Sequence, residues 1–161
     1  MTEPIKVVFV CLGNICRSPL AEALFIHELD KEGIFHSFTI DSCGTNGLHN
    51  GEAADKRTRE NASKHGIAVP SISRQLTYGD IQDFDYIITM ASDVYFQVLR
   101  FCETKEEQLK VHLFRKYDPK APSANVPDPW YGGVDGFEDV FHIIKENTDY
   151  WIQYFKNNYR L

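Results

Sequence analysis

The 161-residue chain is poor in cysteine and has no long apolar run, and each shortage excludes a class of protein. The four cysteines, at positions 11, 16, 43 and 102, are too few and too scattered for the disulfide framework of a small secreted domain, and none belongs to a Cys-x-x-Cys pair that could hold zinc. The first apolar run ends at Gly13, too early for a signal peptide, and no later run approaches the length of a membrane span. We therefore expect a protein of the reducing cytoplasm.

An excess of positive charge is also missing. The chain has 17 Lys and Arg against 23 Asp and Glu, a net charge of −6, which argues against a general nucleic-acid or membrane-surface binder. None of the six histidines has a partner at a spacing typical of metal ligands, so His65 is predicted to be structural and no metal or other cofactor is expected. With 43% apolar residues, residues 1–161 are predicted to form a single domain, and a monomer is expected.

Short apolar strands alternate with amphipathic helices along the whole chain. The pattern predicts strands at residues 5–10, 37–42, 84–90 and 110–114, and helices at 18–32, 53–65 and 92–102, with a last helix in the C-terminal segment. Such alternation predicts a parallel sheet with helices on both faces, which binds ligands at the carboxyl ends of its strands. The apolar stripe from Phe137 to Phe155 is interpreted as a core contact rather than a partner-binding surface.

The stretch after the first strand carries the most informative pattern. Cys11 follows the predicted strand and starts the loop, and Gly13 with Asn14 favours a tight turn there. Ser18 and Pro19 are typical of a helix N-cap and of the first helical residue. Backbone N–H groups in such a loop, together with the helix dipole, form an anion-binding site. No Lys follows a Gly where a Walker A motif requires it, so nucleoside triphosphate binding is not expected.

Cys11 and Arg17, at the two ends of this loop, predict a reaction at phosphorus. A thiol among N–H donors, near a guanidinium and a helix N-terminus, favours the thiolate at neutral pH. Arg17 offers a planar fork of donors that matches two phosphate oxygens. A nucleophile beside such a clamp predicts displacement through a covalent phosphocysteine. The alternative is an inert, buried Cys11 at the strand end, with Arg17 on the surface.

The long segment from Tyr117 to Gly133 is rich in Pro, Gly and Asp, and loops of this kind are often functional. A phenolate leaving group is basic and departs faster if it is protonated as the P–O bond breaks. The Asp-Pro pairs at Asp118 and Asp128 supply two candidate acids, and their spacing does not choose between them. Either could instead be a simple Asp-Pro turn.

Residues 10–19, Val-Cys-Leu-Gly-Asn-Ile-Cys-Arg-Ser-Pro, resemble the active-site signature of the low-molecular-weight protein tyrosine phosphatases, and the resemblance extends over nearly the whole chain. It implies a three-layer α/β fold with a four-stranded parallel sheet of order 2-1-3-4 and flavodoxin-like winding. It also implies a metal-free signalling hydrolase that acts on phosphotyrosyl proteins or peptides, with acid phosphatase activity on small aryl phosphates. Phosphate, vanadate and sulfate are the competing anions it implies.

The resemblance assigns roles in the loop after the first strand and chooses one acid. Cys11 is implied to be the nucleophile, and Asp128 the acid of the first step and then the base that activates water. Asp128 opens an Asp-Pro-Trp-Tyr run like that of the family's acid loop. Trp130 and Tyr131 would line the groove for the phenyl ring, the alternative being exposed loop aromatics. The phosphate-binding residues implied are Leu12, Gly13, Asn14, Ile15, Cys16, Arg17 and Ser18.

The resemblance also gives supporting roles to residues around the nucleophile. Ser18 is implied to donate a hydrogen bond to the Cys11 sulfur, which is compatible with an N-cap role. Asn14 is implied to hold a left-handed conformation, with Ser42 bonding its side chain. Asn tolerates that backbone conformation better than most residues.

Asp55, Arg57 and Cys16 are less clearly assigned. Asp55 and Arg57 resemble a family Asp-x-Arg near the base of the site, and charges on a solvated helix are the alternative. Cys16 is implied to be able to form a disulfide with Cys11 that protects the nucleophile from over-oxidation. Packing beneath the loop is the alternative role for Cys16, and the two can hold together.

The chain departs from the family pattern at three positions. In the family, an aromatic residue forms one wall of the substrate groove. Here Leu48 replaces it and would line the groove together with Trp130 and Tyr131, so a change in specificity is expected. Ser71 stands where a His is often found, and Ala91 where an Asp is usual, and those two side chains could pair beneath the loop. Tuning rather than loss of activity is expected, because the nucleophile, the phosphate clamp and the acid are all retained.

Two other functions are compatible with parts of this pattern. An arsenate reductase on the same scaffold would need two further cysteines close together after the irregular stretch at residues 70–74, and residues 75–101 contain none. A non-catalytic phosphate- or phosphotyrosine-binding module would be expected to lack the nucleophile or the acid, and both are present. A phosphatase is therefore the leading interpretation.

Overall fold

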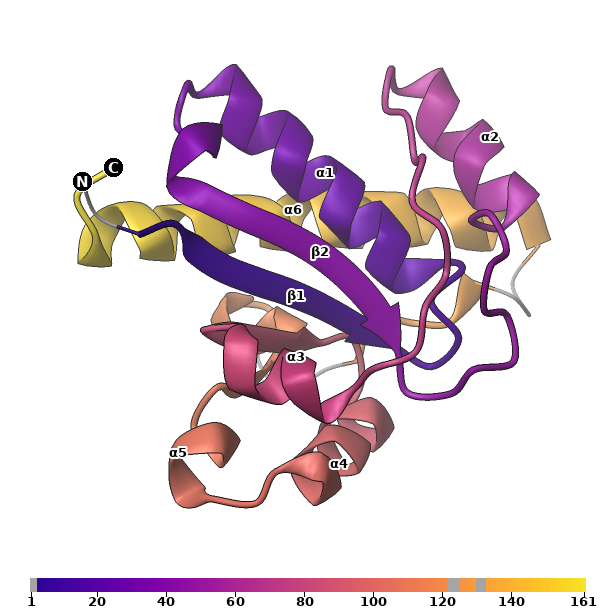
Figure 1. The fold of residues 1–161 in the computed structure, drawn as a ribbon. Helices are drawn as coiled ribbons and strands as arrows, with labels where there is room; N and C mark the ends of the chain where they lie inside the picture. Colours follow the sequence, from indigo (N-terminus) through magenta and orange to yellow (C-terminus); the bar gives the residue numbers. More distant parts are fainter. Residues whose placement is uncertain (1–2, 122–124, 130–132) are drawn as a thin grey trace.

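A four-stranded parallel sheet lies between two layers of helices (Figure 1). The computed structural model describes residues 3–121, 125–129 and 133–161. The strands are β1 (Ile5–Cys11), β2 (Phe38–Gly44), β3 (Tyr86–Thr89) and β4 (Val111–Leu113). They are arranged in the order β2-β1-β3-β4, which confirms the predicted α/β fold and strand order.

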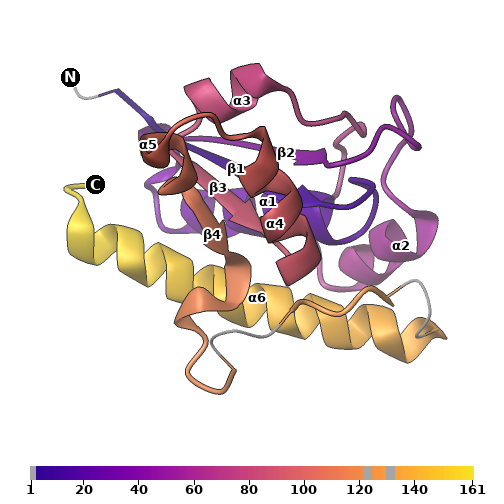
Figure 2. The ribbon, with the colours of Figure 1, turned by 90° about the horizontal axis from the view of Figure 1, so that it is seen from below.

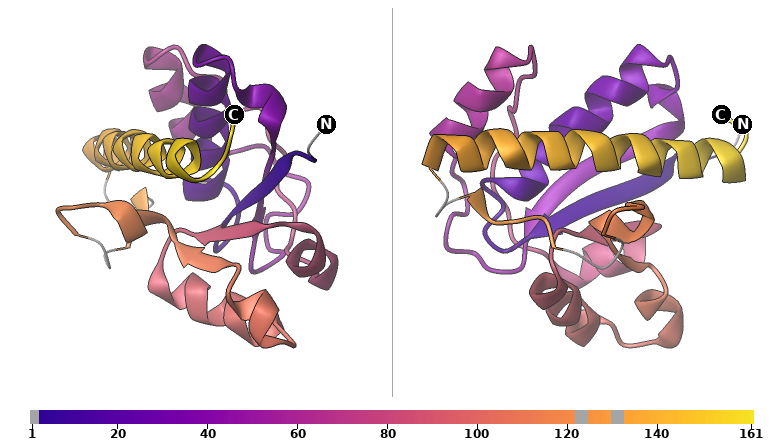
Figure 3. Two further views of the ribbon diagram at one scale, coloured as in Figure 1. Left: turned by 90° about the vertical axis from the view of Figure 1, so that its left-hand side faces the viewer. Right: turned by 180° about the vertical axis from the view of Figure 1, so that it is seen from behind.

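The helices are divided between the two faces of the sheet (Figures 2 and 3). They are α1 (Arg17–Lys31), α2 (Lys56–Lys64), α3 (Tyr78–Asp83), α4 (Ser92–Phe101), α5 (Lys105–Gln108) and α6 (Gly133–Asn158), with short 3-10 turns at Phe35–Ser37 and Phe114–Tyr117. α1 and α6 cover one face, whereas α3 and α4 cover the other. Among the described residues, no helix has both the length and the apolar character needed to span a membrane.

β1 is the centre of the fold because both of its faces are buried. Val7 and Phe9 belong to the core under α1 and α6, whereas Val8 and Val10 belong to the core under α3 and α4. All four side chains are fully buried. A parallel strand with helices on both sides must be apolar at every position, which explains its unbroken apolar run.

The apolar stripe of α6 forms core contacts, as predicted. Phe137, Ile144, Trp151 and Phe155 are all buried against the sheet and α1. The indole Nε1 of Trp151 donates a hydrogen bond to the carbonyl oxygen of Phe114 at 2.7 Å, so its polar atom is also satisfied.

The structure corrects the predicted helices in two ways. The helix expected at 53–65 begins only at Lys56, because Ala53 forms a bridge with Ile72 and Asp55 serves as the N-cap. α3 and α5 were not predicted, since neither is long enough to show a helical apolar period. Each begins with a capping box. The side chain of the N-cap Thr accepts a hydrogen bond from the N–H of the third helical residue, and the acidic side chain of that residue accepts one from the N–H of the Thr.

His112 in β4 is a half-buried imidazole between aromatic rings. Its ring centroid lies 5.6 Å from that of Tyr86 and 5.7 Å from that of Trp151. Burial, with a smaller contribution from the charge of Lys116, lowers the pKa of His112 to about 4.

This pKa predicts a loss of stability on acidification. In the unfolded chain His112 titrates near 6.5, so between about pH 6.5 and 4 the unfolded state binds the additional proton. The free energy of unfolding should therefore fall through this window as the pH is lowered. In His112→Gln that slope should be smaller in urea denaturation measured across the window. The exposed-histidine control His27→Gln should keep the full slope, and equal slopes in all three proteins would contradict the assignment.

Candidate active site

A small cavity lies where the carboxyl end of β1 meets the N-terminus of α1. Its volume is about 180 Å³. The described residues that line it are Cys11, Leu12, Gly13, Ile15, Cys16, Arg17, Asn46, Leu48, His49 and Asp128. We call residues 11–18 the Cys11 loop. The cavity brings together Cys11, Arg17 and Asp128, which the sequence analysis predicts as nucleophile, phosphate clamp and acid.

The carbonyl oxygens of the Cys11 loop are held by donors from the surrounding segments. These hydrogen bonds run from Thr45 N to Cys11 O, from Asn46 N to Leu12 O, from Ser73 Oγ to Gly13 O and from Asp55 N to Ile15 O, at 2.8–3.0 Å. In a trans peptide the N–H points opposite to the carbonyl, so carbonyls directed outward turn the following N–H groups inward. The Asn14 N–H has this direction, because it donates to Cys11 Sγ at 3.2 Å. The loop is therefore built to present N–H donors to an anion.

The Cys11 sulfur is buried at the bottom of the cavity and is only 3% exposed as a residue. Its Sγ lies 2.9 Å from Ser18 Oγ. That hydroxyl already accepts a hydrogen bond from Asn14 Nδ2 at 2.8 Å, so its own proton is directed to another neighbour. The sulfur is nearer to it than the other acceptor, the Cys43 carbonyl oxygen at 3.4 Å. Ser18 can thus donate to a thiolate.

Ser18 is not the N-cap of α1, and this prediction is wrong. α1 begins at Arg17 with Cys16 as its N-cap, and that cap makes no side-chain hydrogen bond. The Ser18 hydroxyl is used by Cys11 and Asn14 instead of by the helix N-terminus. The Ser-Pro pattern correctly predicts that a helix begins in this region, but the helix begins at Arg17, one residue before Ser18.

Arg17 connects the Cys11 loop to the segment that carries Asp128. It is 7% exposed, and its Nη1 donates to the carbonyl oxygen of Val126 at 3.0 Å. Val126 in turn donates its N–H to the carbonyl oxygen of Met90, just beyond β3, at 2.8 Å. The buried Val126 therefore fixes both the guanidinium and the segment leading to Asp128. Sequence reasoning missed Val126 because it acts through its backbone.

Asn14 has a backbone φ of 58°, in the left-handed region, as its resemblance to the family implied. Its Nδ2 donates to Ser42 Oγ at 3.0 Å, and its Oδ1 accepts the N–H of Arg74 at 3.1 Å. The contact expected between Asn14 and Ser42 is thus present. Ser42 Oγ also donates to the carboxylate of Glu22, which extends the network into α1.

The two candidate acids lie in very different surroundings. Asp118 is 2% exposed and accepts hydrogen bonds from Arg115, Asn147 and the N–H of Lys120. Burial alone would raise the pKa of Asp118, but these hydrogen bonds outweigh it and hold the pKa below its ordinary value. Asp118 is therefore a buried structural carboxylate, whereas Asp128 is exposed and lines the cavity.

Asp55 supports the Cys11 loop, and the Arg57 guanidinium forms an ion pair with the Asp55 carboxylate at 3.3 Å. Asp55 donates its N–H to Ile15 O at 2.8 Å, and its side chain caps α2 by accepting the N–H of Arg57. The Arg57 guanidinium lies 4.6 Å from the ring centroid of Phe137. Burial, assisted by the Asp55 charge, raises the pKa of the Cys16 thiol to about 12, so Cys16 is protonated at neutral pH.

Gly44 is a functional position that sequence reasoning missed. It ends β2 directly beside the Cys11 loop, since Gly44 pairs with Cys11 in the register of β1 and β2. A Cβ at this position would lie 2.8 Å from Leu12 O and 3.0 Å from Asn14 N. These are backbone atoms, so the loop itself would have to move. A glycine at the end of a predicted strand was the only available signal.

Comparison with known proteins agrees with this geometry. A family model described as low molecular weight phosphotyrosine protein phosphatase matches residues 6–161. The protein of that name from Schizosaccharomyces pombe is 46% identical over 142 residues, which are 88% of this chain and 90% of the relative. The one from Homo sapiens is 37% identical over 137 residues, which are 84% of this chain and 86% of the relative.

The chain belongs to the low molecular weight phosphotyrosine protein phosphatase family. Solved structures agree with the assignment. A protein tyrosine phosphatase from Entamoeba histolytica, with Hepes in its active site, matches with a TM-score of 0.91 at 35% identity and covers 96% of this chain and 98% of its own. A drosophila arginine phosphatase matches with a TM-score of 0.87 at 28% identity and covers 94% of this chain and 98% of its own.

The three residues that depart from the phosphatase family pattern lie in different surroundings. Leu48 lines the cavity and is 82% exposed, so this leucine stands at the groove without being packed. Ser71 lies near the Glu22 carboxylate, whereas Ala91 is the buried N-cap of α4. Trp130 and Tyr131, predicted to line the phenyl groove, lie outside the described residues.

His49 lines the cavity, although the sequence analysis predicted no role for it. Its Nδ1 lies 2.7 Å from Glu52 Oε2, and its Cδ2 lies 3.0 Å from where a Cβ on Gly13 would be. The imidazole therefore lies over Gly13 at the rim of this phosphatase-family site.

A methyl group at Gly44 should disable the site while leaving the fold intact. In Gly44→Ala the displaced Cys11 loop should lower kcat/KM for an aryl phosphate by about 100-fold, the cost of misplacing reacting groups by about 1 Å. Gly79→Ala is the matched control, because a Cβ at Gly79 makes only an ordinary 3.5 Å contact with Thr77 Oγ1. Unchanged kinetics in Gly44→Ala would contradict the predicted role of this glycine.

Proposed function

We propose that this chain is a protein tyrosine phosphatase that hydrolyses phosphotyrosine, and small aryl phosphates, through a covalent phosphocysteine. The observation that carries the proposal is one cavity that holds Cys11, Arg17 and Asp128 together. The inward-turned N–H groups of the Cys11 loop add to Arg17 as the anion clamp. Phosphate, vanadate and sulfate should compete for the same place.

In the first step the Cys11 thiolate attacks phosphorus. The S–P bond forms as the P–O bond to the phenol breaks, and protonated Asp128 gives its proton to the departing oxygen. Arg17 and the loop N–H groups hold the three remaining oxygens, where charge concentrates in the transition state. No step of this route requires a metal ion.

In the second step water releases the phosphate. The Asp128 carboxylate accepts a proton from water as the water oxygen attacks phosphorus and the P–S bond breaks. Ser18 Oγ, 2.9 Å from the sulfur, donates a hydrogen bond to the departing thiolate. The products are inorganic phosphate and the original enzyme.

The cavity wall favours a phenyl ring over a guanidinium group, although arginine phosphatases share the fold. Leu12, Ile15 and Leu48 contribute apolar side chains to the wall. A phosphoarginine would bring several N–H donors that need acceptors, and among the described lining residues these would have to come from Asn46, His49 and Asp128, the last of which is the proposed acid. Leu48 would contact the phenyl ring without stacking on it, and Trp130 and Tyr131 remain the predicted aromatic walls.

The remaining assignments concern the setting of the enzyme. We propose phosphotyrosyl proteins as its partners and a monomer in the reducing cytoplasm as its working form, because a reactive thiolate needs reducing conditions. Cys16 has no role in the two steps above. Its protection of Cys11 through a disulfide remains a prediction.

The test is hydrolysis of a phosphotyrosyl peptide at mildly acidic pH, in chelator and reductant. Cys11→Ser should be inactive. Asp128→Asn should be slowed by about 10² to 10⁴, the range for loss of a general acid. Asp30→Asn, which changes an exposed carboxylate at the far end of α1, should match the unmodified protein.

A second readout separates the acid from a structural role. The loss in Asp128→Asn should shrink for an aryl phosphate with a weakly basic leaving group, because such a group needs no proton. An equal loss for both substrates would contradict the role of Asp128. Faster turnover of phosphoarginine than of phosphotyrosine would overturn the proposed substrate, and loss of activity in chelator would overturn the metal-independent route.

A further inference from the structure

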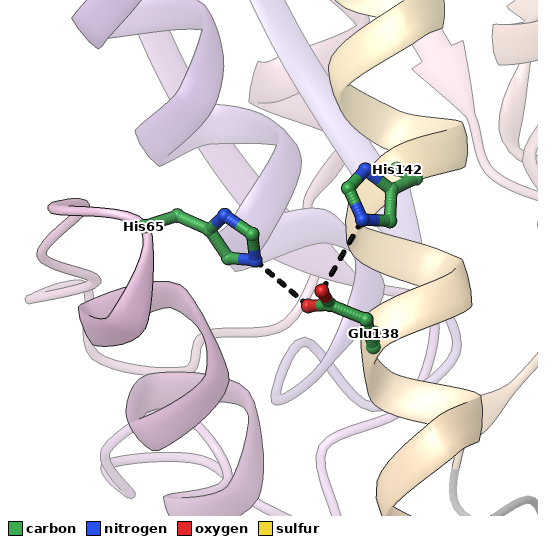
Figure 4. A group of neighbouring side chains, drawn as sticks. All are labelled: His65, Glu138 and His142. Carbon is green, nitrogen blue, oxygen red and sulfur yellow. Dashed lines mark hydrogen bonds and ion pairs between the residues drawn. The ribbon is translucent and has the colours of Figure 1, made fainter.

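His65, Glu138 and His142 form a compact group outside the cavity (Figure 4). His65 Nε2 lies 2.7 Å from Glu138 Oε1, and His142 Nε2 lies 3.2 Å from Glu138 Oε2. One ligand atom from each of the three residues can be chosen so that all lie within 4.8 Å of one another. The sequence analysis found no ligand spacing among the histidines, because His65 meets Glu138 only through the fold.

The elements that carry these side chains fix their directions. Glu138 and His142 are four positions apart in α6, so they lie on the same face of the helix. His65 is the C-cap of α2. Its ring stacks on Phe141, with centroids 4.0 Å apart and planes 12° apart, which holds the imidazole in a defined plane.

A buried amide supports the carboxylate from behind. Asn61 is 7% exposed and donates from Nδ2 to Glu138 Oε1 at 3.0 Å. Its Oδ1 is buried with no hydrogen-bond partner among the described residues. Ligating carboxylates in metal sites are themselves hydrogen bonded in this way, which orients them before the metal arrives.

We propose that His65, Glu138 and His142 bind a divalent transition-metal ion such as Zn²⁺. Two imidazoles and one carboxylate are a common zinc ligand set, with solvent in the fourth position. Zn–N and Zn–O bonds of about 2.0–2.2 Å place the ligand atoms of a tetrahedral ion about 3.3 Å apart. The observed 2.7 and 3.2 Å separations run to different oxygens of Glu138, and the chosen ligand atoms of the three residues lie within 4.8 Å of one another, so side-chain rotations must bring all three to the tetrahedral spacing.

Metal binding replaces the two hydrogen bonds to Glu138. In the free protein each Nε2 donates its proton to the carboxylate, which can only accept. On metal binding each neutral ring must move that proton to Nδ1 and coordinate through Nε2, so no net proton is released. His142, whose side chain is 63% exposed, can turn toward the ion, whereas stacking on Phe141 keeps His65 in place.

The ion would clamp α2 to α6 without taking part in phosphoryl transfer. None of its three ligands lines the cavity. α2 follows Asp55, which holds the Ile15 carbonyl, and the start of α6 lies near Pro129, since a Cβ on Gly136 would be 3.6 Å from Pro129 O. The proposed site therefore joins two helices that support the active site from outside, and it stands independently of the proposed function.

The test is titration of tag-free protein with Zn²⁺ by calorimetry, in the Cys11→Ser background to remove the thiol that lines the cavity as a competing metal ligand. We expect one ion per chain. His142→Gln and Glu138→Gln should each weaken binding by at least about 10- to 100-fold, the cost of losing even an outer-shell partner. His27→Gln, which changes an exposed histidine of α1, should bind like the parent.

Two further measurements test whether the ion binds at His65, Glu138 and His142. Zn²⁺ should raise the unfolding temperature of the parent and not that of His142→Gln, since a ligand stabilises only a state that binds it. The bound-Co²⁺ spectrum should show nitrogen and oxygen ligation without a thiolate charge-transfer band. Absence of binding, a thiolate band, or loss of binding in His49→Gln but not in His142→Gln would overturn the site, the last by pointing to the His49–Glu52 pair.

Discussion

The active site depends on the side chain of Asn14. Its amide joins Ser18, Ser42 and the backbone of Arg74, so one residue connects the start of α1, the end of β2 and the segment before α3. The same residue holds the left-handed turn that most residues adopt only at a cost of about 1–2 kcal/mol. Three hydrogen bonds of about 1 kcal/mol each are enough to offset such a turn. These hydrogen bonds favour a loop that is already formed before phosphate binds.

The sheet supplies the second half of the site. β1 is the strand from which the Cys11 loop emerges, and the carboxyl ends of its neighbours β2 and β3 both support the site. Gly44 at the end of β2 allows the loop to lie close, and Met90 after β3 anchors Val126, which holds Arg17. The proposed nucleophile, clamp and acid therefore meet because three parallel strands end at one edge, as in other open α/β sheets.

The sequence predicts the parts of this arrangement that depend on the type and order of the side chains. The apolar run of β1, the alternation of strands and helices, and the Cys-to-Arg spacing are local patterns, and they define the fold and the position of the loop. Asp118 and Asp128 could not be separated from the residues alone, because both are followed by Pro. The fold distinguishes them, because Asp118 is buried and contacts Asn147, far along the chain, whereas Asp128 lines the cavity.

The residues that sequence reasoning missed either act through their backbone or make contacts with residues far away in the sequence. Val126 acts through its carbonyl and N–H groups, and Gly44 acts by having no side chain, so neither has a chemical signature. His65 and Glu138 are 73 positions apart and meet only where α2 ends against α6. The N-cap of α1 was misplaced because the Ser18 hydroxyl serves the Cys11 sulfur instead of the helix.

We infer that hydrogen bonds to its carbonyl oxygens preorganise the Cys11 loop for an oxyanion. A pair of crystal structures, one of the free protein and one with vanadate, would test this. We expect that residues 12–17 superimpose, that Asn14 keeps its positive φ, and that the loop N–H groups point at the vanadate oxygens. A loop that rebuilds on binding, breaking its carbonyl hydrogen bonds to Thr45, Asn46 and Asp55, would contradict it.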